Sequence, residues 1–123
     1  MKEKILIADD SSFMRIMLKE ELFESGFENI IEAKTGNEAL TMYKVERPAV
    51  VILDVTMPEM DGIETLKHIK KVDPDANVIM CSSMGQEEVV MSCFEAGAVD
   101  FVMKPFKPGR VLQAISKILN PEE

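Results

Sequence analysis

Acidic and basic side chains stand directly after several apolar runs of this sequence. Asp9 and Asp10 follow the first run, Asp54 the third and Lys104 the fifth. Carboxylates that converge on one place repel each other unless a cation shares the site. Mg²⁺ typically binds one or two carboxylates together with waters and phosphate oxygens. These residue types therefore indicate metal-assisted phosphoryl chemistry in which a carboxylate is the nucleophile.

Ser82, after the fourth run, and Lys104 would serve the same reaction. A serine hydroxyl donates to a phosphoryl oxygen, and a lysine supplies a positive point charge. Each residue alone is more simply explained as a helix cap or a solvated side chain. Their joint arrival at one edge of a sheet favours a site. Pro105 follows Lys104, and a cis bond there would fix the direction of the lysine, but the sequence leaves the isomer open.

Five apolar or β-branched runs, each bounded by turn or polar residues, predict the strands that position these groups. They span residues 4–8, 29–33, 49–53, 77–81 and 99–103. The first, third and fourth are almost continuous in Ile, Leu and Val, as parallel strands covered on both faces are.

Apolar residues at helical spacing fill the intervals between the runs. Strict alternation of strand and helix implies right-handed crossovers and one parallel sheet with helices on both faces, an α/β fold. We expect Gly26 to end the first helix and Pro48 the second. The predicted helix starts are the capping pairs Thr35 with Glu38, Asp61 with Glu64 and Ser83 with Gln86, and Pro108 as a first-turn residue.

The methionine side chains divide between the core and a partner surface. Flexible thioethers suit a surface that repacks around a partner, and we assign Met84 and Met91 to such a surface. His68 is expected to be a solvated helix residue. We assign Met80 and Met103 on strands, and Met14 and Met17 on the first helix, to the core. Phe13, Leu18 and Leu22 fall at the same helical spacing as Met14 and Met17.

Composition and charge narrow the class of protein. The chain has 123 residues, 46% hydrophobic and 29% charged, which suits a single compact domain. Its formal net charge of −8 argues against nucleic acid or an anionic membrane as partner. Its apolar runs are too short for a signal peptide or a membrane span, so we expect a cytoplasmic protein. Cys81 and Cys93 match no metal spacing and are expected to be buried free thiols.

The whole chain resembles the receiver domains of the two-component response-regulator family, and within it the stand-alone chemotaxis regulators. The order and spacing of the matching segments extend over residues 4–119. The resemblance implies a single receiver domain over residues 1–123. It also implies a doubly wound, flavodoxin-like (βα)5 sheet with strand order 2-1-3-4-5, which CheY-like proteins illustrate. The matching segments are residues 5–10, 51–54, 57–62 and 102–106.

By this resemblance, Asp54 is the phosphoacceptor in a Mg²⁺-dependent reaction. Asp10 is then a direct ligand of the metal, Asp9 a metal-site carboxylate that acts largely through water, and Thr56 a ligand through its backbone carbonyl. The resemblance also implies a role for three further residues. Ser82 moves toward the phosphoryl group, Phe101 turns inward, and Lys104 contacts the phosphoryl group.

The resemblance implies a regulatory phosphoacceptor that catalyses only its own phosphorylation and dephosphorylation. The implied partners are a CheA-like histidine kinase, a flagellar or archaellar motor-switch component or an adaptor, and a phosphatase, with the chain as a monomer. A phosphorelay intermediate, which passes its phosphoryl group to another histidine protein, is an alternative. An aspartate-nucleophile phosphatase is less favoured, because Thr56 stands where such enzymes need a second acid. The lifetime of the phosphoryl group is left open.

Overall fold

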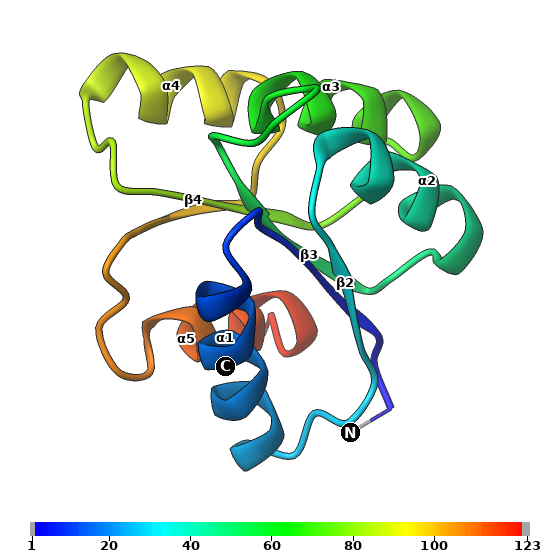
Figure 1. The fold of residues 1–123 in the computed structure, drawn as a ribbon, viewed down its shortest axis with the longest axis vertical. Helices are drawn as coiled ribbons and strands as arrows, with labels where there is room; N and C mark the ends of the chain where they lie inside the picture. The colour runs from blue at the N-terminus through cyan, green and yellow to red at the C-terminus, as the bar shows by residue number, and fades with distance from the viewer. Residues whose placement is uncertain (1, 122–123) are drawn as a thin grey trace.

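Strands and helices alternate along the chain in the computed structural model, which describes residues 2–121 (Figure 1). Within these residues the strands form one parallel sheet in the order β2-β1-β3-β4-β5. The predicted α/β fold and strand order are confirmed. The elements are β1 (Ile5–Ala8), α1 (Ser12–Glu24), β2 (Ile30–Ala33), α2 (Gly36–Glu46), β3 (Val50–Asp54), α3 (Gly62–Val72), β4 (Val78–Ser82), α4 (Glu87–Glu95), β5 (Asp100–Met103) and α5 (Arg110–Leu119).

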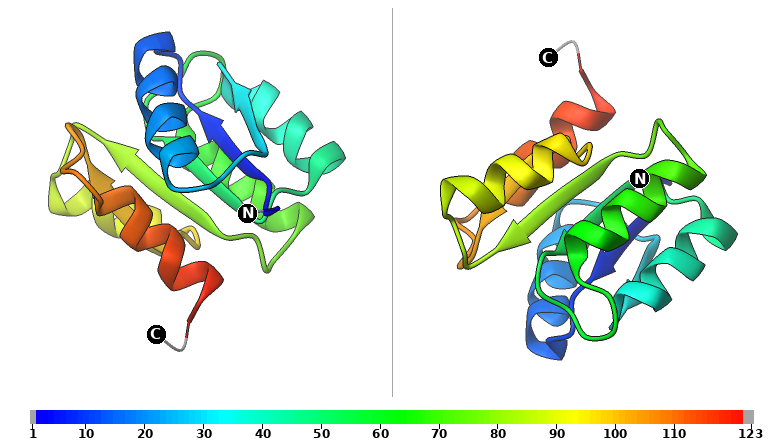
Figure 2. Two further views of the ribbon diagram at one scale, coloured as in Figure 1. Left: turned by 90° about the horizontal axis from the view of Figure 1, so that it is seen from below. Right: turned by 90° about the horizontal axis from the view of Figure 1, so that it is seen from above.

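Helices cover both faces of the sheet. Figures 1 and 2 show α2, α3 and α4 on one face and α1 and α5 on the other. Successive strand residues point to opposite faces, so in β1 Leu6 joins the apolar core under the first group of helices and Ile7 the core under the second. Every residue of β1, β3 and β4 is buried, which explains why these runs are continuous rather than alternating in the sequence.

The central strands extend to the polar residues that end them. β3 ends at Asp54 and β4 at Ser82, one residue beyond each predicted end, and all five strands begin one residue later than predicted. Asp54 is paired with Cys81 in the register, and the amide of Val55 donates to the Cys81 carbonyl at 2.9 Å. The backbone ladder therefore continues past the last apolar side chain, and both polar residues are held as strand residues.

Two of the predicted capping pairs are confirmed. The Thr35 hydroxyl accepts from the Glu38 amide at 3.1 Å, and the Asp61 carboxylate accepts from the Glu64 amide at 2.9 Å. Glu38 also accepts from the amide of Lys34, the residue before the N-cap, at 3.2 Å. Both helix starts are thus fixed by local chemistry that the sequence shows directly.

The predicted start of α4 is wrong. The helix begins at Glu87, and its N-cap Gln86 makes no side-chain capping hydrogen bond. Residues 83–86 instead form an irregular loop, because the amide of Met84 is bound back to the Ser82 hydroxyl at 2.9 Å. The last helix also begins later than Pro108, at Arg110.

The buried stripe of α1 differs from the prediction. Its buried residues are Arg15, Leu18 and Leu22. Met17 is exposed, and so is Met103 on β5, so their assignment to the core is wrong. Phe13, at the same helical spacing, is exposed as well. An arginine faces inward from this helix instead, and the edge strand β5 has an uncovered position.

Other expectations about single side chains are confirmed. Met80 is fully buried, and Cys81 and Cys93 are buried free thiols. Met84 and Met91 are exposed. α1 ends at Glu24, two residues before a Gly26 with a left-handed φ of 94°. No helix between residues 2 and 121 combines the length and apolar character needed to cross a membrane.

Candidate functional site

The carboxyl ends of β1, β3 and β5 bring three charged side chains into contact. β1 and β3 are neighbours with Ala8 opposite Leu53, so the residues that follow, Asp9 and Asp54, lie side by side. Lys104 Nζ lies 2.7 Å from Asp9 Oδ2 and 3.2 Å from Asp54 Oδ2. This edge of the sheet thus holds two carboxylates and one ammonium group in direct contact.

The lysine that joins the two acids is anchored through its backbone. The amide of Lys104 donates to the carbonyl of Ser82 at 2.9 Å, which continues the pairing of β5 with β4. The bond between Lys104 and Pro105 is cis, which answers the question that the sequence left open. From this position the lysine side chain reaches from β5 to the acids that follow β3 and β1.

Burial makes this cluster electrostatically demanding. Asp9 is 1% exposed and Asp54 6% exposed. Burial, and then the charge of Asp9, raise the pKa of Asp54, while Lys104 and the Thr56 amide act in the opposite direction without cancelling the rise. Burial alone would lower the pKa of Lys104, but its hydrogen bond to Asp9 and the nearby negative charges raise it overall. The lysine is therefore a permanent cation that does not fully compensate two acids.

The donor set fits a hard divalent cation. One oxygen each of Asp9 and Asp54 and the sulfur of Cys81 lie within 4.8 Å of one another. Two carboxylates with one lysine leave a net negative charge, and carboxylate oxygens are the ligands that Mg²⁺ prefers. Burial raises the pKa of the Cys81 thiol, so this residue is a neutral neighbour of the acids rather than a charged one.

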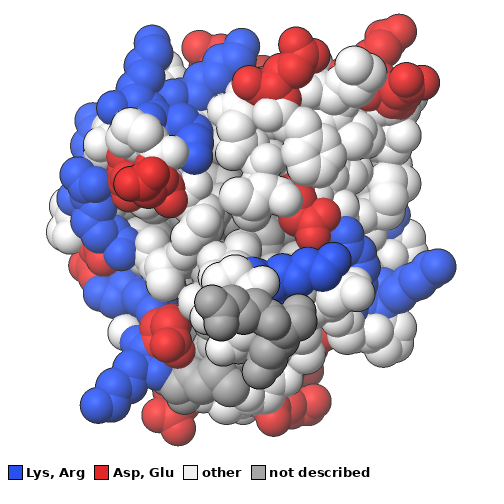
Figure 3. Space-filling model, turned by 180° about the vertical axis from the view of Figure 1, so that it is seen from behind, with Lys and Arg blue, Asp and Glu red and all other residues white. Residues whose placement is uncertain are grey.

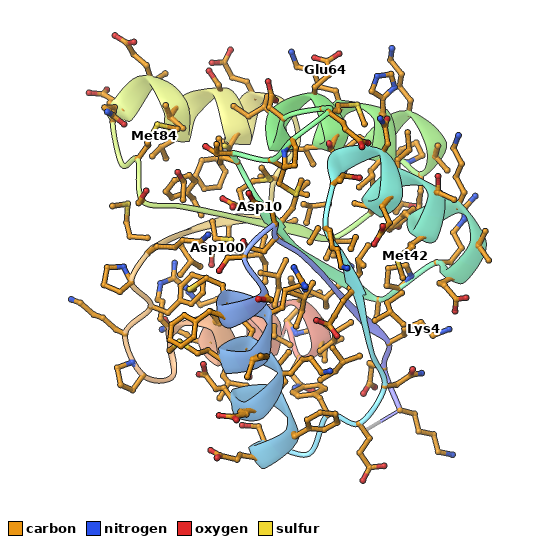
Figure 4. All side chains as sticks on the ribbon, in the orientation of Figure 1. Lys4, Asp10, Met42, Glu64, Met84 and Asp100 are labelled. Carbon is orange, nitrogen blue, oxygen red and sulfur yellow. The ribbon has the colours of Figure 1, made fainter. Side chains whose placement is uncertain are left out.

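The structure gives the remaining predicted ligands a different setting. Asp10 is exposed, and Figure 4 shows it at the end of β1, at the edge of the sheet where the acids gather. Thr56 is also exposed, and its amide donates to Asp54 Oδ1 at 3.4 Å. The contact between Asp9, Asp54 and Lys104 does not include either residue. Their roles as metal ligands stay predictions.

The two predicted switch residues lie on the adjacent strands. Ser82 is 2% exposed, and its hydroxyl oxygen accepts from the Met84 amide at 2.9 Å. Phe101 on β5 is half-buried against the core beneath α2, α3 and α4. In this structure the serine is bound to its own loop, and its hydroxyl hydrogen is available to another acceptor.

A glycine brings α3 against the end of β3. A Cβ atom on Gly62 would lie 2.0 Å from the carbonyl oxygen of Asp54, and the Gly62 amide donates to the Val55 carbonyl at 2.7 Å. No larger residue fits this approach without displacing the strand end that carries Asp54. In the sequence Gly62 is only part of a matching segment; its direct contact with the site residue is a finding of the structure.

Sequence reasoning also missed Arg15 and Glu32. Arg15 Nη1 donates to the backbone carbonyl of Asp9 at 2.7 Å, and its Nε donates to Glu32 Oε1 at 2.9 Å. An arginine within an amphipathic helix is normally solvent-exposed, which hides this contact. The available signal was Glu32, an acid in the middle of a predicted strand.

Comparison with known proteins agrees with this geometry. A family model described as the response regulator receiver domain matches residues 5–116. The chain belongs to this receiver family. Chemotaxis protein CheY of Bacillus subtilis is 52% identical to it, over 98% of this receiver chain and 100% of that protein. The sporulation initiation phosphotransferase F of the same organism is 38% identical, over 97% of this chain and 95% of that protein.

A solved structure supports the same classification of the receiver. A chain in the crystal structure of a CheX-CheY-BeF3-Mg+2 complex from Borrelia burgdorferi superposes with a TM-score of 0.91. Its sequence identity is 39%, and the match covers 95% of this receiver and 89% of that chain. The protein is a CheY-like response regulator receiver domain, as the resemblance predicts.

Proposed function

We propose that this protein is a chemotaxis response regulator that accepts a phosphoryl group from a CheA-like histidine kinase onto Asp54. The observation that carries the proposal is the buried contact of Lys104 with Asp54 and Asp9 at the carboxyl edge of the sheet. Membership of the receiver family supports the phosphoacceptor role, and the likeness to a chemotaxis protein along its whole length supports the pathway. The receiver domain acts as a monomer.

The proposed reaction transfers a phosphoryl group between two nucleophiles. A carboxylate oxygen of Asp54 attacks the phosphorus of a phosphohistidine, and an acyl phosphate forms as the P–N bond breaks. The electron pair of that bond stays on the imidazole, which takes a proton from solvent. Lys104 provides positive charge beside the incoming oxygens, while Asp9 holds the lysine in place. When bound by Asp9, Asp10, Asp54 and the Thr56 carbonyl, Mg²⁺ supplies further positive charge at these oxygens.

Phosphorylation is then detected by Ser82 and Phe101. The phosphoryl oxygens offer the Ser82 hydroxyl a stronger, charged acceptor. As the serine moves toward them, the loop bound to it through the Met84 amide moves as well. Phe101, half-buried on the neighbouring strand β5, turns into the space that is vacated. The result is a population shift between two arrangements of the β4–α4 loop.

The output surface lies over α4, β5 and α5. It includes four exposed apolar side chains: Met84 in the loop before α4, Met91 and Phe94 on α4, and Met103 on β5. Thioethers among these exposed side chains adapt to the shape of a partner. Figure 3 shows the rear face of the molecule, where uncharged residues occupy much of the upper middle and Lys and Arg gather mainly along the left side. The partner is a flagellar or archaellar motor-switch component or an adaptor, and a phosphatase resets the receiver.

A phosphorelay role is the second candidate. The 38% identity to the sporulation phosphotransferase supports it. We rank it second because the identity to the chemotaxis protein is higher, at 52%. Transfer of the phosphoryl group from this receiver to a second histidine protein would favour the relay. A free-standing phosphatase is less favoured, because Thr56 supplies no second acid beside the nucleophile; we expect no turnover of simple phosphomonoesters.

Direct labelling tests the proposal. We expect a small acyl-phosphate donor with Mg²⁺ to add one phosphoryl group, as measured by the mass of the intact protein. Asp54→Asn and metal chelation should each abolish the addition. Asp73→Asn is the matched control, because Asp73 is a hydrogen-bonded aspartate on the far end of α3. Undiminished labelling of Asp54→Asn would contradict the assignment.

Lys104→Ala separates labelling from switching. We expect this variant to be labelled by the small donor but not to gain affinity for its partner, because the lysine reports the phosphoryl charge more than it captures the donor. A pull-down with and without the donor measures the gain. A normal phosphorylation-dependent gain in Lys104→Ala would refute the role given to the lysine.

A further inference from the structure

A buried arginine links the edge strand of the sheet to the acidic site. Arg15 lies in the first turns of α1 and is 7% exposed. It donates to the Asp9 carbonyl through Nη1 and to Glu32 through Nε. A guanidinium group is buried at high cost unless its donors are satisfied. These two contacts therefore explain why an arginine occupies a core position of α1.

The bond from Arg15 controls the peptide between two acids. The carbonyl of Asp9 belongs to the rigid, planar peptide group whose nitrogen is that of Asp10. A hydrogen bond to this carbonyl thus fixes the orientation of the peptide plane, and with it the position of the Asp10 backbone nitrogen. Asp9 is held at both carboxylate oxygens too: Oδ1 accepts from the Ser11 amide at 2.9 Å, and Oδ2 from Lys104 Nζ at 2.7 Å.

The other end of the guanidinium is fixed by Glu32 on β2. Glu32 Oε1 accepts from Arg15 at 2.9 Å and Oε2 from Lys19 Nζ at 3.0 Å. Burial opposes ionisation of Glu32, but the hydrogen bonds from Lys19 and Arg15 lower its pKa overall, so it remains a carboxylate. Arg15 is consequently hydrogen-bonded both to β2 and to the Asp9 carbonyl. Its rigid, planar guanidinium holds these two partners in a fixed relative position better than a flexible lysine ammonium could.

We propose that Arg15 is a positioning residue for the divalent-cation site, since it orients the Asp9–Asp10 peptide and with it the two carboxylates that face the cation. This inference rests on the proposed Mg²⁺-dependent function and deepens it. Arg15 itself contacts neither the cation nor the phosphoryl group. Groups that orient metal ligands typically change metal affinity by about 10–100-fold when they are replaced.

Electrostatics and positioning predict opposite results for the loss of Arg15. Removing one positive charge near the acids should strengthen cation binding by electrostatics alone. Loss of orientation should weaken it. Lys19→Met is the matched control, because Lys19 contacts the same Glu32 and carries the same charge but has no hydrogen bond to Asp9. The two variants remove equal charge and differ in the contact to the carbonyl.

The experiment measures Mg²⁺ affinity of the protein without any phosphodonor, by titration followed through backbone amide chemical shifts. We expect Arg15→Met to bind Mg²⁺ about tenfold more weakly than wild type. Lys19→Met should bind as wild type does or slightly more tightly. Arg15→Lys keeps the charge but cannot reproduce both hydrogen bonds, so it too should bind more weakly. Thermal unfolding without Mg²⁺ establishes which variants are folded. If Arg15→Met does not fold, the Mg²⁺ affinity of Arg15→Lys is the test.

The outcomes are distinguishable. Wild-type affinity in the folded Arg15 variants, or tighter binding, would overturn the inference and leave the proposed function intact. An equal weakening in Lys19→Met would also overturn it, since the effect would then belong to the pairing with Glu32 and not to the Asp9 carbonyl. Failure of the wild-type protein to bind Mg²⁺ would instead contradict the proposed function itself.

Discussion

Asp54 and Asp73 lie at opposite ends of the α/β layers and respond to their surroundings in opposite ways. Burial and the charge of Asp9 raise the pKa of Asp54. A hydrogen bond from the Tyr43 hydroxyl, at 2.7 Å, lowers the pKa of Asp73. Asp73 also accepts from the Asp75 amide at 3.0 Å. The negative charge of Asp54 is thus not fully compensated, whereas the Asp73 carboxylate accepts hydrogen bonds from two donors.

The difference separates the carboxyl edge, where we propose the chemistry, from the opposite end, where the charged side chains have local partners. At the far end, single pairs are satisfied locally: Lys4, which Figure 4 shows at that end, binds Glu46, and Lys70 donates to the Ala76 carbonyl. At the carboxyl edge, one lysine is shared by two buried acids. The surplus negative charge there lowers stability but creates a place for a cation, as functional sites commonly do.

The largest effect is expected where the carboxyl edge is most tightly packed. Gly62→Ala should lower the free energy of unfolding by about 3 kcal/mol, because its Cβ would overlap the Asp54 carbonyl. Gly26→Ala is the far-end control: its Cβ would meet open space, so only its φ of +94° is strained, at about 1–2 kcal/mol. Urea unfolding measures both. A Gly62→Ala loss no larger than that of Gly26→Ala would refute the close contact.

The next largest effect is an increase in stability, whereas most substitutions of buried residues lower it. Asp54→Asn should raise the free energy of unfolding near neutral pH by about 1–2 kcal/mol, since it removes an incompletely compensated buried charge. With a raised pKa in the folded state, the folded protein binds more protons just above the ordinary pKa of the unfolded chain. Wild-type stability therefore falls as pH rises through this window, and Asp54→Asn should lack the fall.

Asp73→Asn is the control, because the contribution of Asp73 to the free energy of unfolding should depend on pH in the opposite direction. Its folded-state pKa is lowered, so its stabilising contribution is present above the ordinary pKa and is lost as pH falls through the lowered one. Unfolding measured from acidic to neutral pH compares both variants. Slopes of the same sign for the two acids would contradict the contrast between the two ends.

A smaller effect is expected from the hydrogen bond that joins α2 to α3. Tyr43→Phe keeps the buried ring but removes the hydroxyl that binds Asp73, and it should cost about 1 kcal/mol. Phosphoryl labelling of Asp54 should be unchanged in this variant, because the lost bond lies at the far end. Reduced labelling of a folded Tyr43→Phe protein would mean that the two ends are coupled.

The smallest effect belongs to an exposed pair. Glu64 and His68 lie one turn apart on α3, with Glu64 Oε1 and His68 Nε2 3.8 Å apart and their side chains 55% and 43% exposed. Glu64→Gln should change the free energy of unfolding by about 0.5 kcal/mol or less. Urea unfolding measures the change. A loss well above about 1 kcal/mol would show that Glu64 does more than form this exposed pair.

Local chemistry was sufficient to predict much of this architecture. The continuous apolar runs reveal strands buried on both faces, and the strict alternation with helices leaves few topologies to choose from. Thr35 and Asp61 begin their helices as predicted, because a cap depends on residues three positions apart. The failure at Ser83 also has a local cause: the hydroxyl of the preceding residue, Ser82, accepts a hydrogen bond from the Met84 amide and keeps the loop out of the helix.

What the sequence by itself determined is the set of polar residues that follow the strands, and hence which side chains meet at one edge. Only the tertiary structure decided how they meet: that Asp9 and Asp54 share Lys104, that Gly62 lies against the Asp54 carbonyl, and that Arg15 is buried to bind Asp9. Periodicity records which side of a helix is apolar on average. It does not record a polar contact between α1, β2 and a backbone carbonyl, because that contact depends on how three separate elements pack.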